Sequence, residues 1–383
     1  MAPRNGMPNV RLSTRTRGSS WQALTEPRAD PTHFAVGGLL YSLVPIAFIL
    51  ALSASAAPAT PTALTQNDAF DRQPSWSPDG SRIAFISSRS GTSDIYMMDR
   101  NGNNQTNLTR NNAENYLPSW SPDGARIAFT SLTSRRGGTS DIYVMDRDGS
   151  NQTNLTQDEA GNWSTTWSPD GARIAFEAAP IWHVDIYMMD ADGKNQVNVT
   201  QTEAEDRYPS WSPDGTQIAF ASDRDGRFEI YTMDADGANP QRLTQGLQWD
   251  YQSGLSWSPD GTRIAFASWG IPHTGTAISV MDVTGGNRVE LTHPTLASLV
   301  TTSDGIPYST HEVYVDHWYP RWSPDGTQIA FTSDRDAVFH FDKTTGGFAH
   351  ESTGIYVVGL SETVAGVRSG GHGLTMWGKV KSP

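Results

Sequence analysis

The residues best suited to metal chemistry in this sequence are five histidines that lie outside its repeated strands: His183, His273, His311, His317 and His340. Neutral imidazole nitrogens bind divalent transition metals, so converging histidines could hold such an ion. No two of the five have the spacing of a helical His-x-x-x-His motif, and solvated loop histidines are the simpler interpretation. The metal site is therefore left open, and no cofactor is expected.

A second candidate is the acidic motif Asp-x-Asp-Gly-x-Asn, whose copies begin at Asp146, Asp190 and Asp234. It resembles part of a calcium-binding loop but lacks the Gly at the sixth position and the bidentate Glu at the twelfth. Each copy lies where a hairpin turn is needed, so a structural turn is favoured. Nucleophilic hydrolysis is not indicated, because the sequence has no Gly-x-Ser-x-Gly elbow.

These candidates are carried by a repeat that begins with Trp-Ser-Pro-Asp-Gly, at Trp76, Trp120, Trp167, Trp211, Trp257 and Trp322. Pro, Asp and Gly in this order predict a tight turn with Gly at positive φ. Ile-Ala-Phe follows each turn and predicts a half-buried strand. A third strand, such as Asp-Ile-Tyr-Met-Met-Asp at 94–99, and a turn leading to a Leu-Thr or Val-Thr pair complete a unit of four strands.

Six such units predict an all-β fold, a six-bladed β-propeller of four-stranded antiparallel blades. The six Trp and six Phe of the repeat are expected to form the blade cores. Leu64-Thr65 precedes Trp76 by the same eleven residues that separate Thr109 from Trp120. Residues 62–65 are therefore expected to close the ring as the fourth strand of blade six, near residues 355–358, with Leu374-Thr375 as the competing segment.

Loop length varies only between the second and third strands and between the fourth strand and the next Trp. In a four-stranded up-and-down blade both loops emerge on one face, here called the variable face, and the turns of constant length form the opposite, constant face. The variable face includes residues 135–138, 180–183, 269–274, 294–319 and 336–353. Loops on a rigid scaffold usually carry function, so a site is expected there.

Aromatic residues gather in the segments assigned to the variable face, and aromatics are typical of interface hot spots. The alternative is that part of them pack beneath their own loops. The most heavily rebuilt connection lies between Thr292 and Trp322, and the interaction site is expected to centre on it. The predicted binding residues are Trp182, His183, Trp249, Tyr251, Trp269, His273, His311, Tyr314, His317, Trp318 and Tyr319.

The N-terminal segment 1–57 has an arginine-containing lead, an uncharged run over 34–57 and small residues at its end. This pattern predicts a signal peptide or, if it is not cleaved, a membrane anchor. Residues 58–63 are then a linker, 64–376 the propeller and 377–383 a C-terminal tail. The net charge of −13 argues against nucleic acid as a partner, and the lack of cysteine excludes disulfides and thiolate metal sites.

The run from Leu-Thr through Trp-Ser-Pro-Asp-Gly and Ile-Ala-Phe to Asp-Ile-Tyr-x-Met-Asp resembles the repeat of TolB-type six-bladed β-propellers, over about residues 62–360. The α/β domain that precedes the propeller in TolB is not found in this sequence. The resemblance implies a non-enzymatic, periplasmic or secreted scaffold that binds a protein or peptide, with an envelope lipoprotein as one candidate partner. The chain is expected to be a monomer that meets the membrane only through its N-terminal segment. The alternative is a metal-dependent polysaccharide lyase or other carbohydrate-active enzyme resembling oligogalacturonate lyase, whose metal is held by histidine.

Overall fold

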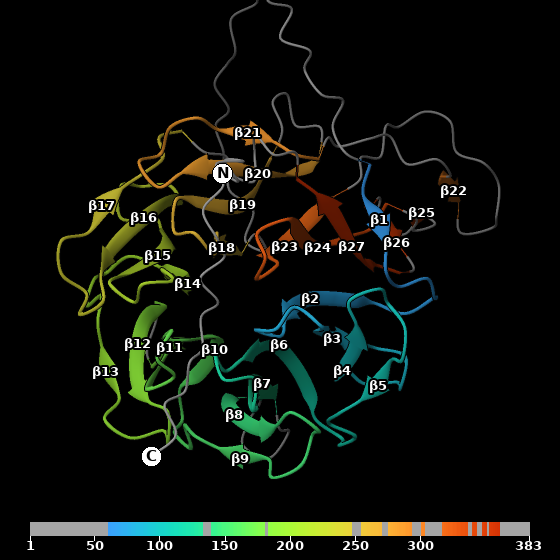
Figure 1. Cartoon of the computed structure of the whole chain (residues 1–383), viewed down its shortest axis with the longest axis horizontal. Coiled ribbons are helices and arrows are strands. Elements are labelled where there is room, and N and C mark those ends of the chain that lie inside the picture. The colour runs from blue at the N-terminus through green and yellow to red at the C-terminus, as the bar shows by residue number, and fades with distance from the viewer. Residues whose placement is uncertain are drawn as a thin grey trace, which may run out of the picture. The chain divides into compact units, whose positions relative to one another are not determined.

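The structure is a computed structural model that describes residues 60–132, 139–180, 183–246, 254–269, 275–292, 300–302, 316–335, 339–342, 347–350 and 352–360. Only the backbone is described at 269, 300–302, 339–342 and 347–350. These residues form six four-stranded antiparallel sheets arranged as blades around a ring (Figure 1). The predicted all-β six-bladed propeller is confirmed. No helix in the described part of the chain is suited to crossing a membrane.

Each blade runs from an inner strand at the ring centre to a short outer strand. The inner strands are β2 (Asp71–Trp76), β6 (Glu114–Trp120), β10 (Gly161–Trp167), β14 (Asp206–Trp211), β18 (Leu255–Trp257) and β23 (His317–Trp322). The second strands are β3 (Arg82–Ser87), β7 (Arg126–Leu132), β11 (Arg173–Ala179), β15 (Gln217–Ser222), β19 (Arg263–Trp269) and β24 (Gln328–Ser333). The third strands are β4 (Asp94–Asp99), β8 (Ser140–Asp146), β12 (Asp185–Asp190), β16 (Glu229–Asp234), β20 (Thr276–Asp282) and β27 (Gly354–Gly359). The outer strands are β5 (Thr106–Asn107), β9 (Thr153–Asn154), β13 (Val197–Asn198), β17 (Gln241–Arg242), β21 (Val289–Glu290) and β1 (Thr62–Ala63).

The core lies between neighbouring blades as well as within them. Trp76 and Phe85 of blade one pack with Ile355 and Val357 of blade six, and equivalent clusters join the other blades. All six repeat Phe side chains have no exposed surface, and the six Trp side chains are buried. Burying a large aromatic side chain contributes about 2–3 kcal/mol before the loss of conformational entropy is counted. The prediction that these residues form the blade cores is confirmed.

The turns of the constant face are held by a repeated set of hydrogen bonds. Asp79 Oδ1 accepts hydrogen bonds from Ser77 Oγ at 2.6 Å and from the Ser81 backbone N–H at 2.9 Å. Gly80 has a φ of +66°, as predicted, and its five equivalents lie between +67° and +73°. The two kinds of constant turn lie side by side, because the Arg100 N–H donates to Ser81 O.

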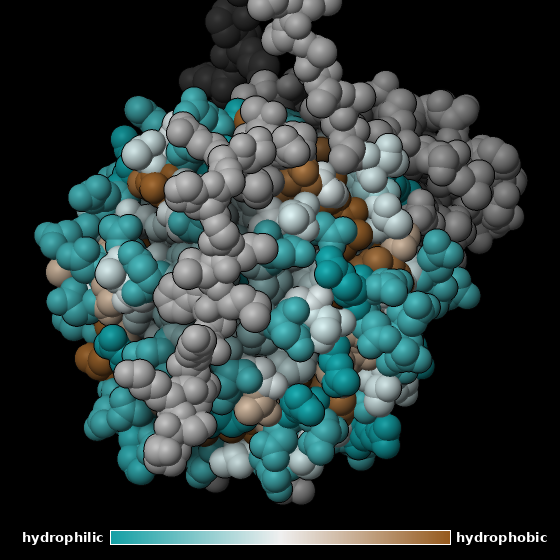
Figure 2. All heavy atoms as spheres, in the orientation of Figure 1, coloured by the Kyte–Doolittle hydropathy of each residue, from teal (hydrophilic) through white to brown (hydrophobic). Residues whose placement is uncertain are grey.

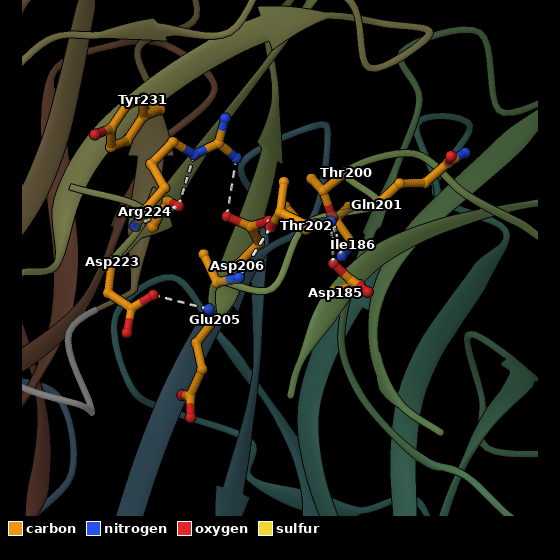
Figure 3. Close-up of polar contacts among 12 residues, drawn as sticks. Asp185, Ile186, Thr200, Gln201, Thr202, Glu205, Asp206, Asp223, Arg224 and Tyr231 are labelled. Atoms are coloured by element: carbon orange, nitrogen blue, oxygen red, sulfur yellow. Dashed lines mark hydrogen bonds and ion pairs between the residues drawn. The ribbon is translucent and has the colours of Figure 1, made fainter. Parts of the chain in front are cut away.

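The outer strands are fixed by a threonine that recurs in every blade. Its hydroxyl oxygen accepts a hydrogen bond from the first Ile N–H of the third strand, as Thr200 does from Ile186 in Figure 3. In blade three, Thr200 Oγ1 also donates to Asp185 at 2.9 Å, and Asn198 Nδ2 donates to the same carboxylate at 2.8 Å. The outer strand is thereby attached through side chains although it is only two residues long.

The ring is closed by the N-terminal strand. β1 pairs with β27, with Thr62 opposite Val357 and Ala63 opposite Tyr356. The recurring threonine of blade six is Thr65, whose Oγ1 accepts from the Ile355 N–H at 3.0 Å. The predicted pairing of residues 62–65 with the third strand of blade six is confirmed, and the competing Leu374-Thr375 lies outside the described residues.

A small three-stranded sheet outside the six blades was not predicted. β22 (Val300–Thr302) lies in the long connection before Trp322 and pairs in parallel with β25 (Phe339–Asp342), which pairs in turn with β26 (Gly347–His350). The long connection is therefore joined to the insertion between the second and third strands of blade six.

Candidate functional site

The six inner strands surround an axial cavity of about 240 Å³. Its lining runs from prolines of the constant turns, Pro78 and Pro324, to residues farther along the inner strands such as Leu117 and Tyr208. The residue before each repeat Trp forms one ring in this lining, which consists of Ser75, Ser119, Thr166, Ser210, Ser256 and Arg321. This ring thus contributes five hydroxyl groups and one guanidinium to the cavity at the same level of the fold.

A β-bulge interrupts five of the six inner strands three residues before the Trp, and in blade five Gly254 has the same position just before β18. The residues at this position all have positive φ, between +49° and +55°, and are Gln73, Leu117, Ser164, Tyr208, Gly254 and Tyr319. The bulge turns backbone N–H groups toward the preceding blade: Gln73 N donates to Thr332 Oγ1 at 3.0 Å, and Leu117 N donates to Gln73 Oε1 at 2.8 Å. The bulges therefore join neighbouring blades around the cavity.

One of these bulges is bound by a buried carboxylate. Tyr208 N donates to Glu177 Oε1 at 2.7 Å, and burial raises the pKa of Glu177. Arg207 Nη1 lies 3.9 Å from Glu177, whereas Arg207 Nη2 lies 2.8 Å from Glu205. The arginine therefore pairs more closely with the outer carboxylate, and Glu177 serves chiefly as an acceptor for the bulge.

In blades one and four the inner strand begins with a buried aspartate that fixes a variable-face loop. Figure 3 shows the arrangement in blade four, where Asp206 accepts from Arg224 Nη2 at 3.1 Å and from Thr202 Oγ1 at 2.9 Å. Asp71 pairs with Arg89 in the same way in blade one. These polar contacts bind strand to loop and are satisfied within the protein, which indicates a structural role.

Blade six has His317 at the position of Asp206. The ring is fully buried, its Nδ1 lies 2.8 Å from Ser333 Oγ, and its Nε2 has no hydrogen-bond partner among the described residues. Burial, reinforced by the charge of Arg335, lowers the pKa of His317 to about 3. The imidazole is therefore neutral at physiological pH.

Two aspartates adjoin this histidine. The Asp316 N–H donates to Asp334 Oδ1 at 2.7 Å, and Asp316 Oδ1 accepts from the Thr276 N–H at 2.6 Å. Burial, with Asp316 nearby, raises the pKa of Asp334 to about 7. Three titratable groups, Asp316, His317 and Asp334, therefore lie together at the start of blade six.

The predicted binding residues are only partly placed by the structure. His183 is partly exposed, with Nε2 3.3 Å from Asp185 Oδ2, at the start of blade three's third strand. Trp269 ends β19, and its side chain is not described. The other members lie outside the described residues or in β23: Trp182, Trp249, Tyr251, His273, His311 and Tyr314 are outside, and His317, Trp318 and Tyr319 are in β23.

The sequence analysis was wrong to place His317, Trp318 and Tyr319 in a loop. All three lie in an inner strand, and Trp318 and Tyr319 are each only 8% exposed. The strand was missed because residues 294–319 were assigned as a whole to a variable-face connection, whereas the bulge at Tyr319 allows an inner strand to run through Pro320. Whether these residues contribute to binding stays a prediction.

The described residues contain no group of side chains that matches the candidate metal sites of the sequence analysis. Among them, no three His, Asp or Glu side chains are grouped so that they could hold a metal ion. His340 is described only by its backbone, in β25. In the acidic turn motif, Asn151 Nδ2 donates to Asp146 at 2.6 Å and Asn151 has a φ of +53°, so the motif builds a hairpin turn as predicted.

Comparison with known proteins supports the fold assignment. The chain resembles the structure of a candidate TolB from Agrobacterium tumefaciens, with 26% identity and a TM-score of 0.51 over 60% of this chain and 83% of that one. It resembles TolB from Acinetobacter baumannii with 22% identity and a TM-score of 0.55, covering 70% of this chain and 64% of that one. An oligogalacturonate lyase from Vibrio parahaemolyticus has 14% identity and a TM-score of 0.52, over 81% of this chain and 96% of that one, which shows the fold alone.

No curated protein sequence matches the chain significantly. The family described as "TolB beta propeller domain" matches residues 59–180 and 162–305, which together span most of the ring. The matched segments contain the first five Trp-Ser-Pro-Asp-Gly turns and the ring-closing Thr62–Ala63 strand. The chain therefore belongs to the TolB β-propeller family.

Proposed function

We propose that this protein is an extracytoplasmic scaffold that binds a protein or peptide through its variable face. Family membership supports a propeller of the TolB type, and an envelope lipoprotein is the partner class that the sequence resemblance favours. The N-terminal segment 1–57, which lies outside the described residues, would direct the propeller out of the cytoplasm.

The contrast between the two faces carries the proposal. On the constant face the turn carboxylates are used internally, as Asp79 is by Ser77 and Ser81, and turn length does not vary. The variable face includes the loops that differ in length, and its connections after Thr156 and Thr200 carry the exposed carboxylates Glu159 and Glu203. Side chains that are free of a structural role are available to a partner.

The surface chemistry favours recognition through polar contacts. Figure 2 shows one face on which hydrophilic residues predominate and hydrophobic residues occur in small separate groups. Among the described residues, the exposed large hydrophobics are Val197 and Val289, on the outer strands. A partner with basic groups would complement the chain's net charge of −13.

Site-specific crosslinking in the native host tests the proposal. A photo-crosslinking amino acid replaces Glu159 or Glu203 on the variable face, and the matched controls place it at Asp148 or Lys194, which are exposed in constant-face turns. We expect a discrete crosslinked partner from the first pair and none from the second. Equal crosslinking from both faces, or none from either face, would contradict the proposal.

Location is tested separately on the same cells. Fractionation is expected to place the protein with the periplasm, membrane or medium, and mass spectrometry of the N-terminus reports cleavage near residue 57. A protein recovered with an intact N-terminus in the cytosolic fraction would contradict the extracytoplasmic assignment.

A further inference from the structure

Arg321 breaks the pattern of the ring that lines the axial cavity. The equivalent residue in each of the other five blades is Ser or Thr. Arg321 is also the only charged residue among those that line the cavity in the described part of the chain. Among the described lining residues, Arg321 is thus the one cation inside the ring of a protein whose net charge is −13.

In the part of the chain that the structure describes, the Arg321 guanidinium is anchored by neutral groups. Its Nη1 donates to Leu255 O and to Pro320 O, both at 3.0 Å. The surrounding protein lowers the pKa of Arg321 to about 10, because burial disfavours its charged form. No carboxylate among the described residues lies within ion-pair distance, in contrast to Arg89 and Arg224, which bind Asp71 and Asp206.

A partly desolvated cation without an anion is costly, and the described residues supply no anion for Arg321, so their set of charges is incomplete at this site. Nη1 is occupied by the two carbonyls, while Nε and Nη2 make no hydrogen bond to a described residue. Gly254 leaves room beside the guanidinium: a Cβ at this position would approach Nη1 to 3.6 Å and the Tyr319 ring to 3.2 Å. An anion that enters the cavity could accept hydrogen bonds from Nε and Nη2 of Arg321, whose side chain is already fixed through Nη1.

We propose that the axial cavity binds a carboxylate group, with Arg321 as its cationic partner and the Ser and Thr hydroxyls of the ring as additional donors. The planar fork of a guanidinium matches the two oxygens of a carboxylate. One cation balances the single charge of one carboxylate group, and the acidic protein disfavours a group such as phosphate that concentrates more than one negative charge. The volume of about 240 Å³ fits a small acid or the end of a peptide.

This site is independent of the partner-binding proposal. Its hydroxyl ring lies next to the prolines of the constant turns, and its members belong to the inner strands. The carboxylate could belong to a free small acid, or to the C-terminus or an acidic side chain of a peptide. Both sources share the chemistry that Arg321 recognises.

Calorimetric titration of the full chain tests the proposal and separates the sources. The probes are acetate, succinate, an N-acetylated tripeptide with a free C-terminus, the same tripeptide as C-terminal amide, an amidated tripeptide with one Glu, and inorganic phosphate, all at constant ionic strength set with chloride. The variants are Arg321→Ser, which restores the hydroxyl type of the other blades, Arg321→Lys, which keeps the charge without the fork, and Arg227→Ser, which removes an exposed arginine as the control.

We expect saturable binding of at least one carboxylate to the wild type and to Arg227→Ser, at least tenfold weaker binding to Arg321→Ser and intermediate binding to Arg321→Lys. Binding of acetate or succinate assigns a free acid, and binding of only the acid or Glu tripeptides assigns a peptide-borne group. Undiminished binding by Arg321→Ser, no saturable carboxylate binding, or tighter binding of phosphate than of every carboxylate would overturn the proposal. If Arg321→Ser does not fold, the side-chain Nε–H resonance of Arg321, assigned by its loss in Arg321→Lys, must shift on addition of the bound carboxylate.

Discussion

Replacing Thr65 by Val tests whether the N-terminal strand closes the ring as the structure describes. Thr65 is 4% exposed, and its Oγ1 accepts a hydrogen bond from the Ile355 N–H at 3.0 Å. Valine keeps the shape of the side chain but cannot accept that bond. The substitution therefore leaves a buried N–H without its acceptor at the joint between the two ends of the ring.

A buried donor left unpaired costs about 1–3 kcal/mol. For a chain of this size, 1 kcal/mol lowers the melting temperature by about 2 °C, so a decrease of about 2–6 °C is expected. Thr109→Val in blade one should be more severe. Thr109 accepts from the Ile95 N–H and also donates to Asp94 at 2.7 Å, so its loss removes a bond to a charged group as well.

Differential scanning calorimetry of the full chain measures the melting temperature, and hydrogen exchange measures the protection of the Ile355 amide. Thr62→Val is the matched control, because Thr62 lies in the closing strand β1, three residues before Thr65, but is exposed. We expect Thr65→Val to lower both the melting temperature and the protection, while Thr62→Val changes neither. If Thr65→Val leaves both unchanged, residues 62–65 do not close the ring and the reasoning is refuted.

Three further predictions follow from the turns and from blade six. Gly102→Ala should lower the free energy of unfolding by at least about 1 kcal/mol more than Gly226→Ala, as measured by urea denaturation. Both glycines have a φ of +87°, but only a Cβ at Gly102 would collide with a neighbouring carbonyl. Equal effects would contradict the described contact. Hydrogen bonds from Ser121 and the Ala125 N–H lower the pKa of Asp123, so its contribution to stability is present above the unfolded pKa of about 4 and is lost as the pH falls through the lowered folded pKa. Between pH 5 and pH 3 the urea midpoint should therefore fall less in Asp123→Asn than in the wild type, and parallel losses would argue against this. The folded pKa of His317 is about 3, below the usual histidine value of 6.5, so its contribution to stability is present above pH 6.5 and is lost as the pH falls toward 3. His317→Asn should therefore reduce the loss of stability between pH 7 and pH 5, and an undiminished loss would count against a buried neutral imidazole.

The repeated part of the fold could be predicted because its signals are local and occur six times. Ser-Pro-Asp-Gly specifies a turn by itself, and the spacing from Thr65 to Trp76 identifies the closing strand. The start of the inner strands could not be placed, since the bulge near Pro74 shifts the strand register and has no distinct sequence signal. The β22–β25 pairing was missed because two insertions that are far apart in sequence form it, in short strands without a clear alternating pattern.

The candidate site was less predictable than the fold. Aromatic residues such as Trp318 were assigned to a binding surface by residue type, whereas its burial depends on the neighbouring blade. The signal for Arg321 was present in the aligned repeats, where it is the one charged residue at the position before Trp. Variation in loop length points to the variable face, whereas most of the residues that line the cavity lie in inner strands.

Ring closure through β1 also means that the first strand must wait for its partner β27 during synthesis. Thr65 and Ile355 are 290 residues apart in the chain, and at a synthesis rate of about 5–20 residues per second the first strand is made about 15–60 s before its partner. Throughout this interval blade one lacks the neighbour that covers Trp76 and Phe85 on the blade-six side. A β1 of only two residues, exposed at Thr62, offers little edge on which a nascent chain could pair with another copy. The brevity of the closing strand therefore protects the unfinished ring from aggregation during its longest period of exposure.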